Sequence, residues 1–464
     1  MSPHFRGSRR LLPFLAALTF GLIAQGRACG QTYQPLAPGT SAHEPEPGAA
    51  VSDMGAGMPM EARSDSSSAH PPWYIGGNFA VLTECAHAIG DFCDRPSYGR
   101  FWFSAEALLW WQRDPRAPAL VTSSPAGTPF GTAGVLGNST TAILFGGGVI
   151  DQGVFGGSRL TVGGLLPNSD NLGFEASGFL FGKNSTNFNA GSNAAGSPPI
   201  GVPFLGAISG QEAVNMVAFP GTFAGTVNVS QTSQLWGAEG NFVAKANAGG
   251  DTRLTVLAGF RYLDLLENLD LTQNSTVLAG GGLLFNGVTK VAAPNGVQIS
   301  DAFGTRNQFY GGQVGVQAGR DFGPFTIDVN GKIALGNMHE AVNIQGSSAL
   351  VTPQGVTATV PGGLFAVASN SGHETKDVFA AVPEVELRLG YQLCQRLGVF
   401  VSGNFLYVSD VVRPGDQIDR TVNVTQVPTS FAFGLPGGPA RPAPEFNHTG
   451  FWAAGINFGM KFSY

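Results

Sequence analysis

The last sixteen residues of the chain, from Thr449 to Tyr464, alternate almost without a break between two kinds of side chain. One set, which includes Trp452, Phe458 and Tyr464, is apolar or aromatic, and the other set is mostly small or polar. Successive side chains of a β-strand point to opposite faces, so the segment predicts a strand with one apolar face. Aromatic residues at both ends of that face are typical of strands that contact lipid, because aromatic rings gather at the two membrane interfaces. The pattern therefore predicts a membrane-spanning strand.

The composition favours the same class of protein. Of the 464 residues only 12% are charged, whereas soluble domains carry about a quarter. After the N-terminal region, no stretch approaches the roughly 20 apolar residues that a membrane-spanning helix needs. A β-barrel has few charged residues and alternating apolar residues, without long apolar runs. The chain contains 67 glycines, so a glycine-rich secreted β-protein is the competing interpretation. The mild net charge of −6 provides no polybasic surface, so nucleic acid is not an expected partner.

The N-terminus has the organisation of an export signal. Three arginines precede an apolar stretch from Leu11 to Ala24, followed by small residues. This order predicts a cleaved signal peptide over residues 1–28. Cleavage there would leave Cys29 first, but Arg27 beside it argues against lipidation. Residues 29–72 are rich in Pro, Ala, Gly and Ser and predict a disordered linker, and residues 73–98 form a short Cys-bearing periplasmic segment.

Two cysteines of that segment are close in sequence. Cys85 and Cys93 predict a disulfide, since the oxidising periplasm allows one to form. Metal binding is the less favoured alternative, because His87 is their only soft neighbour and there is no second pair of cysteines. This pairing leaves Cys394 unmatched.

From Gly99 onward, alternating segments follow one another as hairpins. The predicted strands are Phe101–Trp111, Ser158–Leu166, Leu172–Lys183, Gln234–Ala246, Thr252–Leu265, Gln308–Arg320, Phe325–Asn337, Val378–Tyr391, Leu397–Ser409 and the C-terminal strand. Short turns alternate with long connections, which are Pro115–Phe155, Asn184–Ser233, Glu267–Asn307, Met338–Lys376 and Val411–His448. Outer-membrane barrels show this alternation of periplasmic turns and extracellular loops. Residues 99–464 therefore predict an all-β, antiparallel, up-and-down transmembrane barrel of about ten strands, or twelve if Ala142–Val149 or Thr226–Ser230 contributes.

The parity of each strand separates residues that face lipid from residues that face the lumen. In Phe325–Leu335 the outer positions carry no charge, while Asp328 and Lys332 fall inside. Pro383 predicts a bulge, because proline removes a donor from the ladder. The charged residues predicted to line the lumen are Glu106, Glu175, Glu239, Lys245, Arg253, Arg261, Asp328, Lys332, Glu384, Glu386, Arg388 and Lys461.

These acids and bases balance, whereas selective pores use rings of one sign. Barrels of around eight strands are filled by side chains and those of 16–18 are open, so about ten strands allow either a narrow pore or a plugged interior. The inward aromatic residues Trp102, Trp110, Phe179 and Phe400 favour a filled interior.

A charged segment follows the ninth predicted strand. Arg413, Asp416, Asp419 and Arg420 predict ion pairs that pin the loop inward as a constriction. A calcium site made by Asp410, Asp416 and Asp419 is the alternative, since carboxylates suit that cation. Their spacing matches no calcium loop, so pinning is favoured and neither a metal site nor a cofactor is predicted.

The same segment carries a family resemblance. The run Asn404–Asn423 is similar to the signature near the C-terminus of the putative beta-barrel porin family seven, and Phe101–Trp111, Ala258–Leu263 and Phe451–Tyr464 resemble strands of that family. The resemblance covers residues 99–464 and implies an outer-membrane barrel. The terminal residues Phe458, Phe462 and Tyr464 also resemble the C-terminal assembly signal of bacterial outer-membrane barrels, which implies the barrel-assembly machinery as a partner.

These features bear on three possible functions. We predict a porin in the outer membrane that passes small hydrophilic solutes with weak ion selectivity; the alternative is a plugged structural or adhesive barrel that acts through its surface loops. Membrane lipid is a predicted partner, and a homo-oligomer is compatible with the sequence. An outer-membrane enzyme would need a nucleophile and a base within hydrogen-bond reach. His339, His373 and His448 lie near loop bases, but no nucleophile motif accompanies them, so no enzyme is predicted.

Overall fold

The computed structural model describes residues 100–247 and 252–464. The chain divides into two compact units, and the described residues all belong to the second, Cys93–Tyr464. The predicted signal peptide, linker and Cys-bearing segment, residues 1–28, 29–72 and 73–98, lie outside the described residues. None of the helices in the described ranges is long and apolar enough to cross a membrane.

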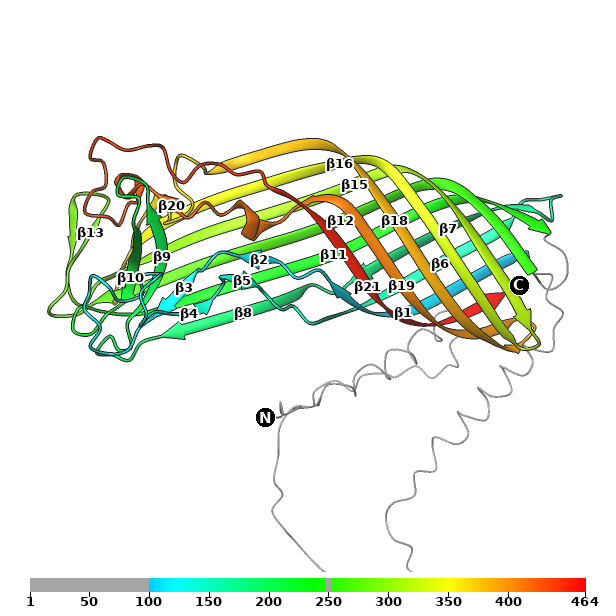
Figure 1. The fold of residues 1–464 in the computed structure, drawn as a ribbon, viewed down its shortest axis with the longest axis horizontal. Helices are drawn as coiled ribbons and strands as arrows, with labels where there is room; N and C mark the ends of the chain where they lie inside the picture. The colour runs from blue at the N-terminus through cyan, green and yellow to red at the C-terminus, as the bar shows by residue number, and fades with distance from the viewer. Residues whose placement is uncertain (1–99, 248–251) are drawn as a thin grey trace, which may run out of the picture. The chain divides into compact units, whose positions relative to one another are not determined.

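Ten antiparallel strands close into a ring (Figure 1), which confirms the predicted fold class. They are β1 (Phe101–Gln112), β6 (Val154–Leu165), β7 (Leu172–Phe181), β11 (Phe223–Asn247), β12 (Thr252–Val277), β15 (Gly296–Phe322), β16 (Phe325–Thr352), β18 (Gly372–Cys394), β19 (Leu397–Val412) and β21 (His448–Ser463). The first strand pairs with the last, from Trp102↔Ser463 to Gln112↔Ala453, so the ring has no free edge. Closure of this kind satisfies the backbone hydrogen bonds without water.

Alternation along the ten strands separates an apolar outer face from the interior. Leu387 and Leu389 on β18, for example, are exposed, while Glu384 and Glu386 are buried. Aromatic side chains flank this apolar belt at both ends, as in other membrane barrels. The girdle on the turn side is Phe101, Phe103, Phe322, Phe325, Tyr391 and Tyr464. The girdle on the loop side is Trp111, Trp236, Tyr310, Tyr407 and Trp452, with the partly exposed Tyr262 packed against Trp236.

The turns at one end are short, as predicted for the periplasmic side. Between β15 and β16 the turn has only two residues, because Phe322 and Phe325 are directly paired. Its first residue, Gly323, has φ +63°, a conformation that glycine adopts without strain. The predicted bulge at Pro383 is wrong: this residue lies in register with Ile333 on β16. The register shift of β18 against β19 is instead between Gln392 and Cys394.

The strands extend much farther on the loop side than the sequence predicted. β11, β12, β15 and β16 contain 25–28 residues, whereas a spanning strand needs only about 9–11. Much of the predicted loops Asn184–Ser233, Glu267–Asn307 and Met338–Lys376 is therefore strand. Figure 1 shows these four strands running on past the others toward β9, β10 and β13. Of the two segments predicted as additional strands, Thr226–Ser230 belongs to β11 and Ala142–Val149 lies outside the ring.

We call the structure beyond the loop-side girdle the head (residues 113–153, 182–233, 267–307, 339–377 and 413–447). A second sheet in it consists of β3 (Val121–Ser123), β4 (Ala142–Phe145), β9 (Ile200–Gly206), β10 (Glu212–Ala218) and β20 (Thr421–Val422). The other elements are β2 (Arg116–Ala117), β5 (Gly148–Val149), β8 (Asn184–Gly191), β13 (Leu283–Phe285), β14 (Thr289–Val291), β17 (Gly355–Pro361) and the 3₁₀ helices η1 (Pro414–Gln417) and η2 (Val424–Gln426).

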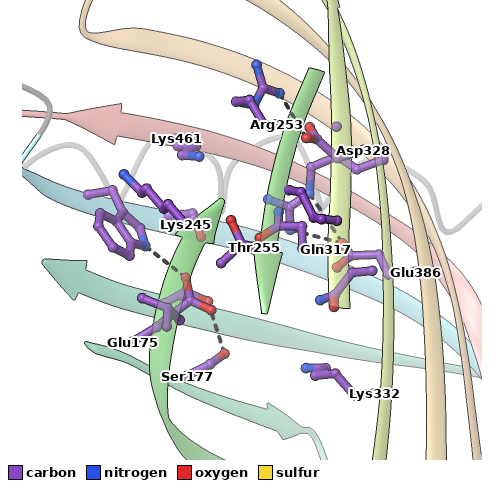
Figure 2. A pocket seen from close by; sticks show the side chains of 18 of the residues that line it. Glu175, Ser177, Lys245, Arg253, Thr255, Gln317, Asp328, Lys332, Glu386 and Lys461 are labelled. Atoms are coloured by element: carbon purple, nitrogen blue, oxygen red, sulfur yellow. Dashed lines mark hydrogen bonds and ion pairs between the residues drawn. The ribbon is translucent and has the colours of Figure 1, made fainter. Parts of the chain in front are cut away.

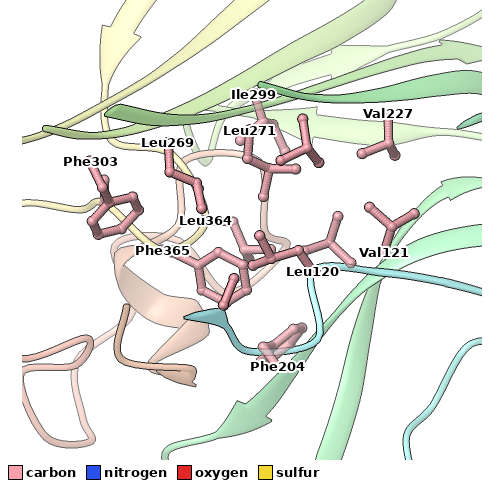
Figure 3. Packing of buried hydrophobic residues seen from close by; sticks show 14 of the residues in the cluster. Leu120, Val121, Phe204, Val227, Leu269, Leu271, Ile299, Phe303, Leu364 and Phe365 are labelled. Atoms are coloured by element: carbon pink, nitrogen blue, oxygen red, sulfur yellow. The ribbon is translucent and has the colours of Figure 1, made fainter. Parts of the chain in front are cut away.

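The head has a hydrophobic core of its own. Figure 3 shows Leu364 and Phe365, from the segment between β17 and β18, among side chains of the extended strands and of the segment that contains β3. Asp301 of β15 holds this segment, because its Oδ1 accepts hydrogen bonds of 2.8–2.9 Å from the backbone N–H groups of residues 364–366. Burial nevertheless raises the pKa of the Asp301 carboxyl to about 7.

Candidate functional site

The turn side of the barrel interior contains a polar cavity of about 460 Å³, which we call the vestibule. Figure 2 shows that the side chains lining it come from strands around the ring. Trp102 Nε1 donates a hydrogen bond to Glu175 Oε2 at 2.8 Å, and Lys245 Nζ lies 5.2 Å from the centre of the same indole ring. Arg253 Nη2 lies 2.9 Å from Asp328 Oδ1. The vestibule is therefore lined by charges of both signs.

Toward the loop side the vestibule ends at a layer of ion pairs, which we call the charged layer. Its members are Glu106, Arg159, Glu239, Arg261, Lys332, Glu384, Glu386 and Arg388. Four acids face four bases, and their side chains are between 1% and 19% exposed. Strand parity places these side chains inside, because each belongs to the inward set of its strand.

Pairing within the charged layer is extensive. Arg388 Nη2 lies 3.1 Å from Glu106 Oε1 and 2.9 Å from Glu386 Oε1. Glu384 contacts Arg261, and it also lies 3.3 Å from Arg159 Nη2 and 3.5 Å from Lys332 Nζ. Buried charges are costly unless they are paired and hydrogen-bonded. The balanced pairing is what allows these eight groups to fill the interior.

An apolar layer lies on the loop side of the charged layer. It contains Leu108, Trp110, Phe155, Phe181, Leu235, Leu263, Leu265, Phe309, Ala334, Met338, Ala380, Val382, Leu406, Val408, Val411, Phe451 and Ala453. Asn457 joins the two layers, since its Oδ1 accepts a 2.7 Å hydrogen bond from Trp110 Nε1 and its Nδ2 lies 3.3 Å from Glu106 Oε2. Trp110 and Phe181 have ring centres 5.0 Å apart, and both side chains are fully buried. The interior at this level is thus packed with side chains.

The sequence matches the family described as Putative beta barrel porin-7 over residues 102–464. The chain belongs to this family. The match confirms the resemblance seen in the Arg413–Asn423 region, and it agrees with the closed ring of strands in identifying an outer-membrane β-barrel.

Solved structures similar to this member of the porin-7 family are distant. Outer membrane protease OmpT from Escherichia coli has 8% identity and a TM-score of 0.32, covering 80% of this chain and 100% of that chain. The translocator domain of autotransporter NalP from Neisseria meningitidis has 11% identity and a TM-score of 0.23, covering 83% and 95%. A Pseudomonas aeruginosa FadL homologue has 9% identity and a TM-score of 0.20, covering 79% and 90%. No curated protein matches. These similarities are too low to transfer a function.

A second, smaller cavity lies beside the charged layer. All twelve residues that the sequence places in the lumen line either the vestibule or this smaller cavity. Arg159 was missed by the sequence analysis, although it lies in the charged layer. Four of the twelve residues in its strand, β6, are glycines, and they weaken the alternation there. The signal that could have found it is the pairing of β6 with β1, which places Arg159 directly opposite Glu106.

The four residues predicted to pin the loop do not pair with one another in the described ranges. Arg413 turns inward at the base of the head instead, where Nε and Nη2 lie 2.8 and 2.6 Å from the carboxylate of Glu267 on β12. Both side chains of that pair are buried. Asp419 pairs with Arg441 at 2.7 Å. The loop is therefore attached to other segments, with Arg413 as its buried anchor.

The remaining members of the predicted set have separate places. Arg420 pairs with Glu212 on β10 at 2.7 Å. Burial raises the pKa of the Asp416 carboxyl in η1, a group that no ion pair joins to the other three. Neither Asp416 nor Asp419 lies with Asp410 in a group of metal-ligating atoms within the described residues, so the calcium alternative is not supported.

Of the three predicted assembly-signal residues, Phe458 and Phe462 belong to the outward set of β21, and Tyr464 directly follows the end of that strand. Phe458 and Tyr464 are exposed, and Phe462 contacts Phe103 with ring centres 6.3 Å apart. Their role in assembly stays a prediction.

The cysteine prediction needs one correction. Cys394, at the end of β18, is disulfide-bonded rather than unmatched. Cys85 and Cys93 lie outside the described residues, so a disulfide between them stays a prediction. The sequence prediction rested on the short spacing between Cys85 and Cys93, and spacing carries no information about the bonding of a cysteine as distant in sequence as Cys394.

Proposed function

We propose that this outer-membrane barrel is closed in its resting state and acts as a structural or adhesive scaffold that presents its head at the cell surface. The observation that carries the proposal is the filled interior. The cavity beside the charged layer has a volume of about 20 Å³, which suffices for roughly one water molecule. A hydrated solute is larger than this cavity, so the charged layer would have to move to let one pass.

The head supports the same proposal. Its strands continue well beyond the apolar belt, and buried side chains such as Phe303 and Phe365 form a core there. A folded surface with its own core suits the binding of another macromolecule better than a set of mobile loops would. The head contains many residues of the described chain, whereas a simple pore needs only the membrane-spanning ring of strands.

Passage of small hydrophilic solutes is the second candidate. The vestibule favours it, because a polar cavity with balanced charges would admit such solutes from the turn side without strong ion selectivity. Transport would then require movement of both the charged layer and the apolar layer. The lipid, assembly-machinery and solute partners, and a homo-oligomer, stay predictions.

Single-channel recording of the refolded chain in a planar bilayer at two salt concentrations tests the proposal. Protease protection and heat-modifiable migration of the same sample establish that the barrel has inserted. A silent bilayer with inserted protein is expected. Stable current steps that scale with salt would reject the closed barrel and support the porin.

If the bilayer is silent, a second pair of variants tests why. Trp110 and Trp111 are adjacent on β1, but Trp110 is fully buried inside and Trp111 is exposed outside. Trp110→Ala removes a large side chain from the apolar layer but leaves the charged layer in place, so this variant is expected to stay silent; current steps in it would show that the apolar layer alone closes the barrel. Trp111→Ala should leave the bilayer silent, since it changes only the lipid-facing surface.

A further inference from the structure

Three side chains with metal-ligating atoms meet at the loop-side end of the spanning strands. They are Glu340 on β16, Asp410 on β19 and His448 on β21. His448 Nδ1 lies 3.1 Å from Glu340 Oε2 and 3.1 Å from Asp410 Oδ1. One ligand atom from each residue lies within 4.8 Å of the other two. This arrangement lies outside the vestibule and the charged layer.

The strand pairing explains why residues from three strands converge here. β18 separates β16 from β19 in the ring. The described β18–β19 ladder ends at Glu384↔Leu406, short of the level of Glu340. β19 also shifts its register against β21 between Val408 and Val411, next to Asp410. The regular ladder is therefore interrupted on both sides of β19 at this level.

The environment of Glu340 favours a bound cation at this position. Its side chain is fully buried, and although His448 Nδ1 lies 3.1 Å from Oε2, neither carboxylate oxygen accepts a hydrogen bond of good geometry from the described residues. Lys376, directly opposite on β18, extends toward Phe446 and lies 4.0 Å from the centre of that ring. A buried carboxylate without donors is costly, so a cation between Glu340 and its neighbours would stabilise the fold.

A protonated His448 does not meet this need as well as a metal ion does. Its Nδ1 carries at most one hydrogen, which can point well at only one of two oxygens that lie equally far away. A bound ion would instead contact all three donors at once. Tetrahedral Zn²⁺ has ligands at about 2.0–2.2 Å, which places neighbouring ligand atoms roughly 3.3–3.6 Å apart. The two observed distances of 3.1 Å are a little shorter, so the three side chains need only a small outward shift to hold the ion.

We propose that Glu340, Asp410 and His448 bind a divalent transition-metal ion of the Zn²⁺ class. Two carboxylates balance the charge of the ion, and one imidazole nitrogen favours a transition metal over Ca²⁺, which takes six to eight oxygen ligands. The fourth position stays open to water, since His448 and Asp410 are each about one-third exposed. The ion ties β16, β19 and β21 together where the β18–β19 ladder is absent. This site was not predicted from the sequence, and it does not depend on whether the barrel conducts.

The test uses the refolded full chain, freed of metal with a chelator and carrying no affinity tag. Isothermal titration with Zn²⁺ should give one saturable equivalent, and Co²⁺ should give the visible absorption of a four-coordinate site. Zn²⁺ should also raise the unfolding temperature, because an ion that binds only the folded state stabilises it by mass action. Absence of a saturable equivalent would reject the site, and so would Ca²⁺ binding as tightly as Zn²⁺.

Variants locate the binding. His448→Gln and Glu340→Gln should weaken Zn²⁺ binding at least tenfold and abolish the Co²⁺ absorption. His339→Gln is the matched control, because His339 is next to Glu340 but on the outward face, where Nδ1 lies 3.0 Å from Asp377 Oδ1. Its Zn²⁺ affinity should equal that of the unmodified chain. Unchanged affinity in His448→Gln would overturn the assignment. If Glu340→Gln does not fold, Asp410→Asn, at a partly exposed position, takes its place with the same expected loss.

Discussion

Replacing Glu384 by glutamine changes the charge of the filled interior with almost no change in side-chain volume. Glu384 is 4% exposed and lies at the centre of the charged layer, in contact with three cations. Its Oε1 also accepts a 2.9 Å hydrogen bond from Asn404 Nδ2, which a glutamine oxygen can still accept. The substitution therefore leaves four bases facing three acids.

The loss of stability in Glu384→Gln depends on the ion pairs that its three cationic partners keep. Arg261 and Lys332 keep Glu239 as a partner, but among the described residues Arg159 keeps only Glu106 as an ion-pair partner, at 4.0 Å. Breaking a buried ion pair by removing one charge typically costs about 3–5 kcal/mol, because the other charge stays desolvated. We expect the free energy of unfolding of Glu384→Gln to fall by roughly that amount.

Urea unfolding of the refolded barrel in lipid vesicles, followed by tryptophan fluorescence, measures this loss. Glu374→Gln is the control, since Glu374 lies on the same strand but is 51% exposed and 4.0 Å from Lys376. Exposed pairs contribute about 0–1 kcal/mol, so this variant should unfold almost as the unmodified chain does. A loss for Glu384→Gln no larger than for the control would refute the reasoning, because it would mean that water reaches the charged layer.

Three further perturbations test other parts of the structure. Val329→Arg places a charge on the lipid-facing side of β16, where it costs about 2–4 kcal/mol, and should reduce the heat-modifiable folded band on a gel; Asn330→Arg, which faces the vestibule, should not. The carboxyl of Asp301 has its pKa raised to about 7 by burial, above its unfolded value, so its contribution favours folding most at low pH and is lost as pH rises. Resistance of the head to proteolysis should therefore increase from pH 8 to pH 5, and Asp301→Asn should remove that dependence. Gly455→Ala would place a Cβ 2.3 Å from a buried indole ring and should lower the urea midpoint, whereas Gly240→Ala, with no atom near the new Cβ, should leave it unchanged.

The ten strands of the ring were predictable because membrane strands carry their signal locally. In β16, Ile327 and Val329 face outward and Asp328 and Asn330 inward, and this alternation identifies the strand without knowledge of its neighbours. The same signal failed where β12 leaves the membrane. Thr272 and Asn274 face outward there in place of apolar residues, so the segment has the composition of a loop although it continues as strand.

Contacts across the barrel were not predictable, because they depend on register and not on spacing along the chain. The pairing of Arg413 with Glu267 joins β12 to the loop after β19, and nothing near either residue in the sequence indicates the other. The convergence of Glu340, Asp410 and His448 has the same origin. Strand parity shows which side chains point inward, but only the closed ring shows at which level each one lies.

The order of the layers argues that closure is a property of the whole interior and not of one gate. A permeating solute would meet the charged layer first, then the apolar layer around Trp110, and then the buried pair of Arg413 and Glu267. The first is held by redundant ion pairs, so moving a single side chain leaves its partners in contact with others. The Arg413–Glu267 pair is joined to the core of the head by the loop that carries Arg413. Opening would therefore require the loop that carries Arg413 to move together with the apolar layer, a change large enough that removing the Arg413–Glu267 pair alone should leave the barrel closed.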